Sequence, residues 1–303
     1  MPMKTILVPV DYSGNSRSAL SCALDLAKTS GADVILFHAF YPIMSPPATF
    51  NVTDVIQALE EGKARSLMEF GEEIRKEVAA ASGEAAAFRN IRLQASASMG
   101  GSYEKILEAI DKYKPDLVVM GMQGGEAVSQ ALLGSTTISV MQESPVPILA
   151  VPRNAKPGPF TSVVFAANLS KLPPNANLHP LTDFINTCHA QLEVLHLYRN
   201  QEQKEKFNAT EALNNLERSL QGVKYHVSFE VQEDVATGIQ QFVKDKNGDL
   251  LVLIPQHHSF LERLLNRSVT GRITPYLQVP LLALPTHTLS PSQSNLSEEL
   301  FVS

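Results

Sequence analysis

The second half of the chain repeats the first half. The matched segments are TILVPVDYS (5–13) with SVVFAANLS (162–170), VILFHAF (34–40) with LEVLHLY (192–198), KPDLVVMGMQ (114–123) with NGDLLVLIPQ (247–256), and SPVPILAVP (144–152) with LQVPLLALP (277–285). The offset falls from 157 residues at the first pair (162 − 5) to 133 at the last (280 − 147), so the second copy is 24 residues shorter. An ordered duplication of this kind predicts two copies of one fold.

Within each copy, two periodicities alternate. The run TILVPV (5–10) is short and rich in β-branched residues, as in a buried strand. Leu20, Ala23, Leu24 and Ala27 follow at the spacing of one apolar helix face. This alternation predicts an α/β fold in which helices cover both faces of a parallel sheet. Further strands are expected over 34–40, 91–98, 116–121 and 146–152, and further helices over 53–80, after a capping Ser102, and from about residue 134.

The length agrees with two domains, because 303 residues is about twice the usual domain of ~100–200 residues. A Pro- and Gly-containing stretch separates the copies and a Ser-rich segment ends the chain. The expected divisions are a first repeat over 1–153, a linker over 154–159, a second repeat over 160–286, and a flexible tail over 287–303.

Composition excludes several classes of function. The net charge is −6; residues 1–153 hold 13 basic and 17 acidic residues, and the remainder hold 12 and 14. Neither half has the basic surface that neutralises nucleic-acid phosphates, so no nucleic-acid partner is expected. No apolar run approaches the ~20 residues of a membrane helix, and the N-terminal segment reads as a strand rather than a secretion signal. The chain has only two cysteines, Cys22 and Cys188, which are expected to be buried reduced thiols. These features together predict a cytoplasmic protein with no membrane partner.

A glycine-rich loop follows the fourth expected strand, with the pattern Gly121-x2-Gly124-x9-Gly134-Ser135. Glycine lets backbone approach an anion closely, and the N–H groups at a helix start suit phosphate. Ligands of open α/β sheets bind at the carboxyl ends of the strands, where Asp11 also lies as an acceptor for ribose hydroxyls. Plain turns and helix caps explain the same residues, so spacing alone leaves both interpretations open. The chain has neither GxxxxGK[ST] nor GxGxxG, which argues against P-loop and dinucleotide-binding enzymes.

With these residues, the whole chain resembles a tandem universal stress protein. ATP-binding members of that family carry G-x2-G-x9-G-[ST], which Gly121, Gly124, Gly134 and Ser135 match at full spacing. The resemblance implies two tandem Rossmann-like (HUP-type) domains, each a five-stranded, mainly parallel sheet flanked by helices. It implies ATP as the ligand, with or without Mg²⁺. The residues that it places around the adenosine are Pro9, Asp11, Ala39, Met120 and Gly121.

The same resemblance assigns the phosphates to the loop and to the start of the following helix. The residues concerned are Gly124, Gly134, Ser135 and Thr136. This chain departs from the family at Gln123, where many members have His or Arg. A neutral amide there gives up one cationic contact to the phosphates.

The second copy departs much further from the pattern. Ile254 stands where the first copy has Gly121, His257 where it has Gly124, and Asn168 where it has Asp11. Asn266-Arg267 replaces the Gly134-Ser135 pair, and the loop is one residue shorter. Side chains now occupy positions that required bare backbone, so the ATP-binding mode is predicted to fail in this copy. Arg267 with His257 and His258 could hold another anion, but a degenerate scaffold is the preferred interpretation.

The remaining histidines give weak signals. His38 and His196 occupy equivalent strand ends and are expected to be hydrogen-bonded structural residues rather than bases. The pair His257-His258 has no carboxylate or thiol at ligand spacing, so no metal site is predicted.

Three functions are therefore compared. The first is a nucleotide-binding stress-response or regulatory protein with its site in the first repeat. The second is a nucleotide-free interaction scaffold that uses the surface of the paired repeats. The third, a weak ATP hydrolase, is less favoured because the glycine loop offers no general base; no catalytic residue is predicted. The resemblance also implies an intramolecular pseudo-dimer formed through the fifth strands. The residues leave open whether two chains form a homodimer.

Overall fold

A computed structural model describes residues 3–42, 52–122, 133–155, 158–174, 176–254 and 279–285. The expected tail over 287–303 lies outside these ranges. The first half contains β1 (Thr5–Pro9), α1 (Gly14–Ser30), β2 (Asp33–Phe40), α2 (Val52–Ser82), α3 (Ala85–Arg89), β3 (Leu93–Met99), α4 (Ser102–Tyr113), β4 (Leu117–Gly121), α5 (Ser135–Glu143) and β5 (Ile148–Val151). The second half contains β6 (Ser162–Ala166), the 3₁₀ helix η1 (Leu169–Lys171), α6 (His179–Cys188), β7 (Gln191–Tyr198), α7 (Gln201–Lys206), α8 (Ala209–Ser219), β8 (Tyr225–Val231), α9 (Val235–Asp245), β9 (Leu250–Leu253) and β10 (Leu281–Ala283).

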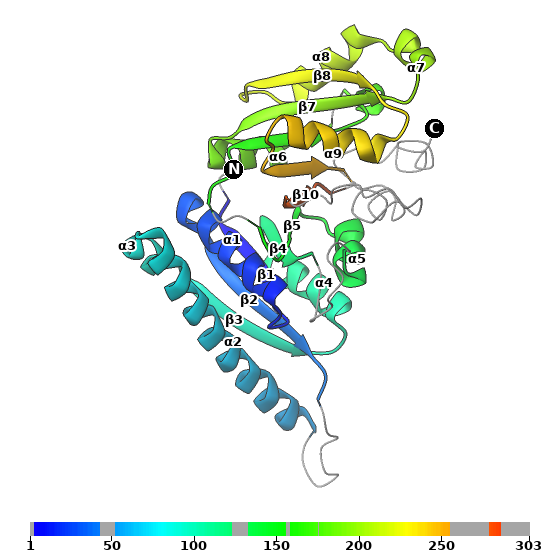
Figure 1. Ribbon diagram of the computed structural model, residues 1–303. Helices are drawn as coiled ribbons and strands as arrows, with labels where there is room; N and C mark the ends of the chain where they lie inside the picture. Colours follow the sequence, from blue (N-terminus) through cyan, green and yellow to red (C-terminus); the bar gives the residue numbers. More distant parts are fainter. Residues whose placement is uncertain are drawn as a thin grey trace, which may run out of the picture.

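All ten of these strands belong to one sheet, in the order β3-β2-β1-β4-β5-β10-β9-β6-β7-β8 (Figure 1). The two halves thus have the same internal order, and every pair within a half is parallel. The halves meet where β5 and β10 pair antiparallel, with Leu149 opposite Leu282. This is the pairing of fifth strands that the family resemblance implies. The expected α/β fold of two mainly parallel five-stranded units is confirmed.

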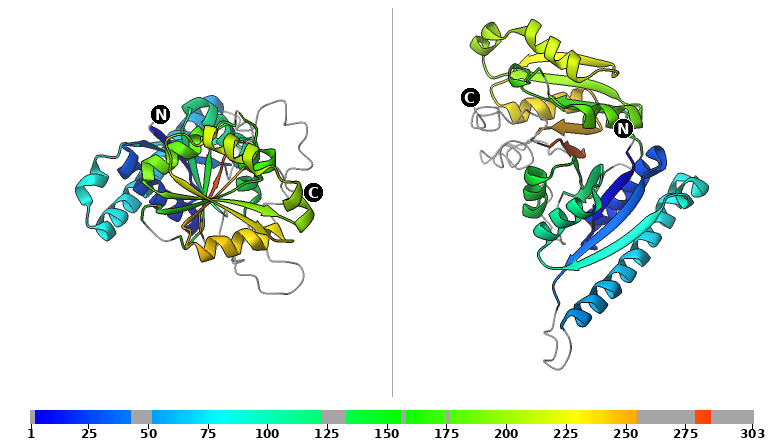
Figure 2. Two further views of the ribbon diagram at one scale, coloured as in Figure 1. Left: turned by 90° about the horizontal axis from the view of Figure 1, so that it is seen from above. Right: turned by 180° about the vertical axis from the view of Figure 1, so that it is seen from behind.

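The strands are buried on both faces, which explains their continuous apolar runs. Along β1, Ile6 and Val8 pack into a core with α1, α2, α6 and α8, whereas Leu7 packs into a second core with α4, α5 and α9. All three side chains are fully buried. Figure 2 shows helices on both sides of the twisted sheet, so each half is a three-layer α/β unit.

The first helix shows how local sequence sets its bounds. Ser13 is the N-cap of α1, and its hydroxyl accepts a hydrogen bond from the backbone N–H of Ser16 at 3.2 Å. Gly31 ends the helix with a φ of 75°, and its N–H donates to the carbonyl of Ala27. The expectation that Ser102 caps a helix is wrong by one position. Gly101 is the N-cap, and Ser102 is the first residue of α4.

The two halves differ most in their helices. The 31-residue α2 lies along β3 in the first half, whereas the six-residue α7 and the eleven-residue α8 occupy the corresponding stretch of chain in the second half (Figure 1). The 17-residue α1 also has a shorter counterpart, because η1 and a non-helical stretch precede the ten-residue α6. Most of the 24 missing residues therefore fall outside the strands.

The two cysteines are free thiols, as expected, but they are half-buried rather than enclosed. Desolvation is the main reason that the pKa of Cys22 is well above its usual value and that the pKa of Cys188 is raised to about 12. Within the described ranges, no helix is long and apolar enough to cross a membrane.

Candidate functional site

A pocket of about 320 Å³ opens at the carboxyl ends of β1, β2 and β4. Its volume falls in the range of ~300–1,000 Å³ that is usual for small-molecule sites. Eight of the nine predicted site residues line it; the ninth, Gly124, lies outside the described residues, as does Gln123. The eight are Pro9, Asp11, Ala39, Met120, Gly121, Gly134, Ser135 and Thr136.

The turn after β1 brings Asp11 to this pocket. The N–H of Val10 donates to the carbonyl of Phe37 at 2.8 Å, which extends the β1–β2 pairing beyond the strand. Asp11 Oδ1 then accepts a hydrogen bond from the N–H of Ser13 at 3.0 Å, and Tyr12 between them has a left-handed φ of 63°. A non-glycine residue adopts this conformation only at a cost, and such costs recur at binding sites. The carboxylate is thereby held at the pocket by the start of α1.

His38 supports the same turn from β2. Its Nδ1 lies 2.7 Å from the carbonyl of Val10, so the ring fixes the backbone next to Asp11. The ring also packs edge-on against Tyr12, with 4.9 Å between centroids. The hydrogen bond expected at this histidine is present.

Gly121 has a packing reason for lacking a side chain. A Cβ there would lie 2.7 Å from Cβ and 2.9 Å from the carbonyl carbon of Asn15, in the first turn of α1. Its carbonyl accepts a hydrogen bond from the Thr137 hydroxyl at 3.0 Å, which ties the end of β4 to α5. Besides the expected approach of bare backbone to an anion, packing also requires that this position have no side chain. The glycine lets α1 approach β4.

The N-terminus of α5 faces the pocket. Gly134 is the N-cap of this nine-residue helix, and its N–H donates to the carbonyl of Met122 at 2.7 Å. The first bond along the helix runs from the N–H of Ile138 to the carbonyl of Gly134. The preceding N–H groups of Ser135, Thr136 and Thr137 therefore have no acceptor within the helix, and all three residues line the pocket. A helix start of this kind favours a negatively charged group.

The charge of the lining is simple. Among the lining residues that the structure describes, Asp11 is the one acidic side chain, and no Lys or Arg is present. The same part of the chain holds no group of three or more His, Cys, Asp and Glu side chains suited to a metal ion. The described wall can thus offer a carboxylate to hydroxyl groups and backbone N–H groups to an anion.

Sequence reasoning missed several lining residues. Phe37 was expected only as part of the strand over 34–40, and Ser102 only as a helix cap. Their common signal is position, since each lies at the pocket end of its strand or helix. The complete set that the predictions omitted is Val10, Ser16, Phe37, Ser102, Ile106 and Thr137.

In the second half, the substitutions have structural consequences. Asn168 replaces Asp11 and is the N-cap of η1; its Oδ1 accepts hydrogen bonds from the Ser170 N–H at 3.2 Å and hydroxyl at 2.6 Å. Ile254 replaces Gly121 and is buried. There the counterpart of the first turns of α1 is not an α-helix, so a side chain fits where Asn15 packs in the first half. The other positions singled out, His257, His258, Asn266 and Arg267, lie outside the described residues.

Comparisons with known proteins agree with an α/β fold of this kind. The model of the universal stress protein family matches residues 2–152. A universal stress protein of Thermus aquaticus is 32% identical over 149 residues, which are 49% of this chain and 98% of that protein. Another, from Methanocaldococcus jannaschii, is 28% identical over 157 residues, covering 50% of this chain and 84% of that protein. The chain belongs to the universal stress protein family.

Some solved structures align with nearly the whole chain. The crystal structure of a universal stress protein from Archaeoglobus fulgidus aligns with a TM-score of 0.63 at 18% identity, covering 94% of this chain and all of that one. A protein of Pseudomonas aeruginosa aligns with a TM-score of 0.58 at 13% identity over 97% of each chain. At such identities the likeness concerns the fold, which here includes both five-stranded units.

Proposed function

We propose that the pocket of the first half binds ATP or a related adenine nucleotide, and that the protein acts as a nucleotide-responsive stress or regulatory protein rather than as an enzyme. One observation carries this proposal. Residues from β1, β2, β4 and the start of α5, distant in sequence and matching the family's ATP motif, line a single pocket of suitable volume.

The chemistry of the wall supports a nucleotide over a simple anion. Asp11 suits ribose hydroxyls as an acceptor, and the apolar side chains of Phe37, Ile106 and Met120 suit a planar base. The helix start at Ser135 suits phosphate. Because the described lining holds no cation, we expect Mg²⁺ to accompany the phosphates and to supply the missing positive charge.

The alternative is a nucleotide-free scaffold that works through the surface of the joined halves. Calorimetric titration with Mg-ATP separates the two, because the proposal requires one site per chain. Release of adenine nucleotide from protein purified from cells and then denatured would support it further. The scaffold is favoured if no nucleotide is released and added Mg-ATP changes neither the heat signal nor the melting temperature.

The residue assignment is tested by Gly134→Val. The φ of Gly134 is −63° and its ψ is 146°, a conformation that valine adopts easily, so the fold should persist while the side chain crowds the phosphate end. We expect Mg-ATP affinity to fall by more than about tenfold. Gly62→Val is the matched control, since a Cβ at Gly62 meets nothing within 4 Å. Gly124→Val tests the neighbouring position of the motif in the same way. Unchanged binding in Gly134→Val would refute the assignment.

A further inference from the structure

The second half has its own pocket, at the position equivalent to the first. It has a volume of about 270 Å³ and opens at the carboxyl ends of β6 and β7. Counterparts line the two pockets: Ala166 with Pro9, Asn168 with Asp11, Leu195 with Phe37, Leu197 with Ala39, Val235 with Ser102, and Ile239 with Ile106. The duplication has thus kept a cavity at a position where the nucleotide motif has been lost.

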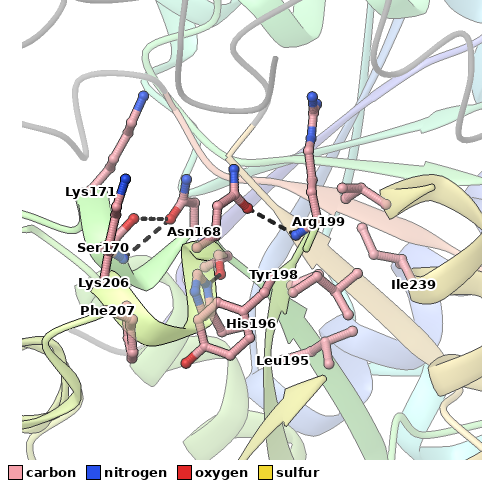
Figure 3. A pocket seen from close by; sticks show the side chains of 15 residues that line it. Asn168, Ser170, Lys171, Leu195, His196, Tyr198, Arg199, Lys206, Phe207 and Ile239 are labelled. Carbon is pink, nitrogen blue, oxygen red and sulfur yellow. Dashed lines mark hydrogen bonds between the residues drawn. The ribbon is translucent and has the colours of Figure 1, made fainter. Parts of the chain in front are cut away.

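The charge of this second pocket is the reverse of the first. Three cationic residues line it from separate elements: Lys171 from η1, Arg199 after β7, and Lys206 from α7. Among its described lining residues there is no Asp or Glu. Figure 3 shows Lys171 and Lys206 on one side of Asn168 and Arg199 on the other, with Leu195 and His196 deeper in the pocket. Cationic side chains that line one pocket favour an anionic ligand there.

Short elements of the second half set the positions of these cations. Lys206 pairs with Glu202 at 2.6 Å, but the two side chains are 74% and 71% exposed, and an exposed pair of this kind is worth little. The backbone N–H of Arg199 donates to Gln203 Oε1 at 2.9 Å, which fixes the start of α7. Lys171 and Arg199 are half-buried, so their charges are less screened than those of fully exposed residues.

The interior of the pocket is apolar and aromatic. Leu197 and Val235 stand where the first pocket has Ala39 and Ser102, so the wall is more apolar than its counterpart. His196 stacks on Phe207 with 4.7 Å between centroids and an interplanar angle of 22°. Burial lowers the pKa of His196, so its ring is neutral at pH 7 and belongs to this wall.

From this geometry we infer that the second pocket binds an organic anion that combines an apolar or aromatic body with a phosphate or carboxylate group. The body lies against Leu197, Val235 and Phe207, and the anionic group lies between Lys171, Lys206 and Arg199. Adenine nucleotide is the poorer ligand here. Asn168 replaces the ribose-accepting carboxylate, and its Oδ1 is already engaged by Ser170.

The test varies the head group on one ring. Full-length protein is titrated by calorimetry with 1-naphthyl phosphate, 1-naphthoate and neutral 1-naphthol, and separately with Mg-ATP. We expect the two anions to bind at one site, with an affinity at least about tenfold above that of 1-naphthol. The affinity of the anions should weaken as the salt concentration rises. The ratio of phosphate to carboxylate affinity then identifies the preferred head group. Failure of both anions to bind at concentrations up to about 1 mM would overturn the inference.

Paired variants locate the site. Val235→Phe fills the second pocket and Ser102→Phe fills the first, at the equivalent first residues of α9 and α4. Val235→Phe should abolish binding of 1-naphthyl phosphate and leave Mg-ATP unaffected, and Ser102→Phe should do the opposite. The two proposals therefore fail separately. The inference would be overturned if Val235→Phe still bound 1-naphthyl phosphate. It would also be overturned if Mg-ATP still bound to Ser102→Phe but no longer bound to Val235→Phe.

A charge test keeps the volume of the pocket. Lys171→Gln with Lys206→Gln should lower affinity for 1-naphthyl phosphate by about tenfold or more and flatten its salt dependence. Lys204→Gln with Lys224→Gln removes the same charge from residues that do not line the pocket. Equal effects of the two double variants would show only a general electrostatic attraction, which contradicts the inferred site.

Discussion

The two halves of this chain share a strand order but differ in the pockets that the strands build. The first pocket carries one acidic side chain and a helix start, whereas the second carries three cationic residues around an aromatic interior. Both lie where a parallel sheet leaves its carboxyl ends uncovered, so the fold supplies the cavity and the loops supply the chemistry. A duplicated domain can therefore keep its cavity after its motif is lost.

The difference also has a packing origin. In the first half, α1 begins close to the end of β4 and requires a glycine there, Gly121. In the second half, the helix begins later and Ile254 fills the space. The loss of a glycine from the motif and the shortening of a helix thus belong together. Substitutions that look like decay of a binding site partly record a change in how a helix packs.

The largest expected effect concerns the contact between the halves. Leu149 on β5 faces Leu282 on β10, and both are fully buried. Leu282→Ala should lower the free energy of unfolding by about 2–5 kcal/mol because it leaves a cavity in the shared sheet. Urea unfolding followed by circular dichroism measures this. Leu59→Ala, at a residue 37% exposed, is the control and should cost less than about 0.5 kcal/mol. A comparably small change in Leu282→Ala would mean that the halves are stable without each other.

The next effect tests the packing difference at β4 and β9. Gly121→Val should lower the free energy of unfolding by about 2–3 kcal/mol, because the new Cβ meets backbone of Asn15 that cannot move aside easily. Ile254→Val, at the equivalent position, should cost only about 1 kcal/mol. Chemical denaturation of both variants gives the comparison, with Gly62→Val as the control at an open site. Similar costs at the two positions would show that α1 does not require the glycine.

Much of this architecture could be predicted from the sequence. Short β-branched runs marked the strands, since buried parallel strands have apolar residues on both faces, and the apolar spacing of Leu20, Ala23, Leu24 and Ala27 marked α1. The predicted site residues came from the family resemblance, and those that the structure describes lie near the ends of β1, β2 and β4 and at the start of α5. Positions fixed to regular elements can be placed from sequence once the order of those elements is known.

The second pocket could not be predicted in this way. Arg199, Gln203 and Lys206 lie in a stretch that matches nothing in the first half, so the repeat gave no alignment for them. Their approach to Lys171 depends on the path of the chain between β7 and α7, which periodicity does not encode. The predictions for Ser102 and Gly121 were incomplete for a related reason. Both depend on which neighbour packs against them.

A reciprocal exchange of the two polar residues sharpens the comparison of ligands. Asp11→Asn should weaken Mg-ATP binding by about tenfold, because the charged acceptor proposed for the ribose hydroxyls becomes a neutral amide. Asn168→Asp places a negative charge among the three cations and should weaken 1-naphthyl phosphate binding by a similar factor. Calorimetry on both variants with both ligands measures this, and each variant is the control for the other. If Asn168→Asp strengthened Mg-ATP binding instead, the second pocket would be a latent nucleotide site.

The smallest expected effect concerns the pH dependence of stability at His196. Buried His196 is 3% exposed, and its Nδ1 lies 3.2 Å from the backbone nitrogen of Leu169 and 3.3 Å from the carbonyl oxygen of Ala167. Burial lowers its pKa below the ordinary value of 6.5, so the unfolded chain binds the proton first as pH falls. This contribution to stability is therefore complete above about pH 6.5 and is lost as the pH falls toward the folded pKa.

His196→Asn keeps a hydrogen-bonding group near the position of Nδ1 and removes the titrating ring. We expect the free energy of unfolding of this variant to change less between about pH 8 and about pH 5 than that of the wild-type protein. His38→Asn is the matched control in the first half, where Nδ1 contacts a carbonyl at 2.7 Å and the ring is only half-buried. Because every other titrating group is retained, the difference between each variant and the wild-type protein isolates one ring. If the pH profile of His196→Asn matched that of the wild-type protein, the aromatic interior of the second pocket would tolerate a charged histidine. The wall of that pocket would then not require a neutral ring at His196.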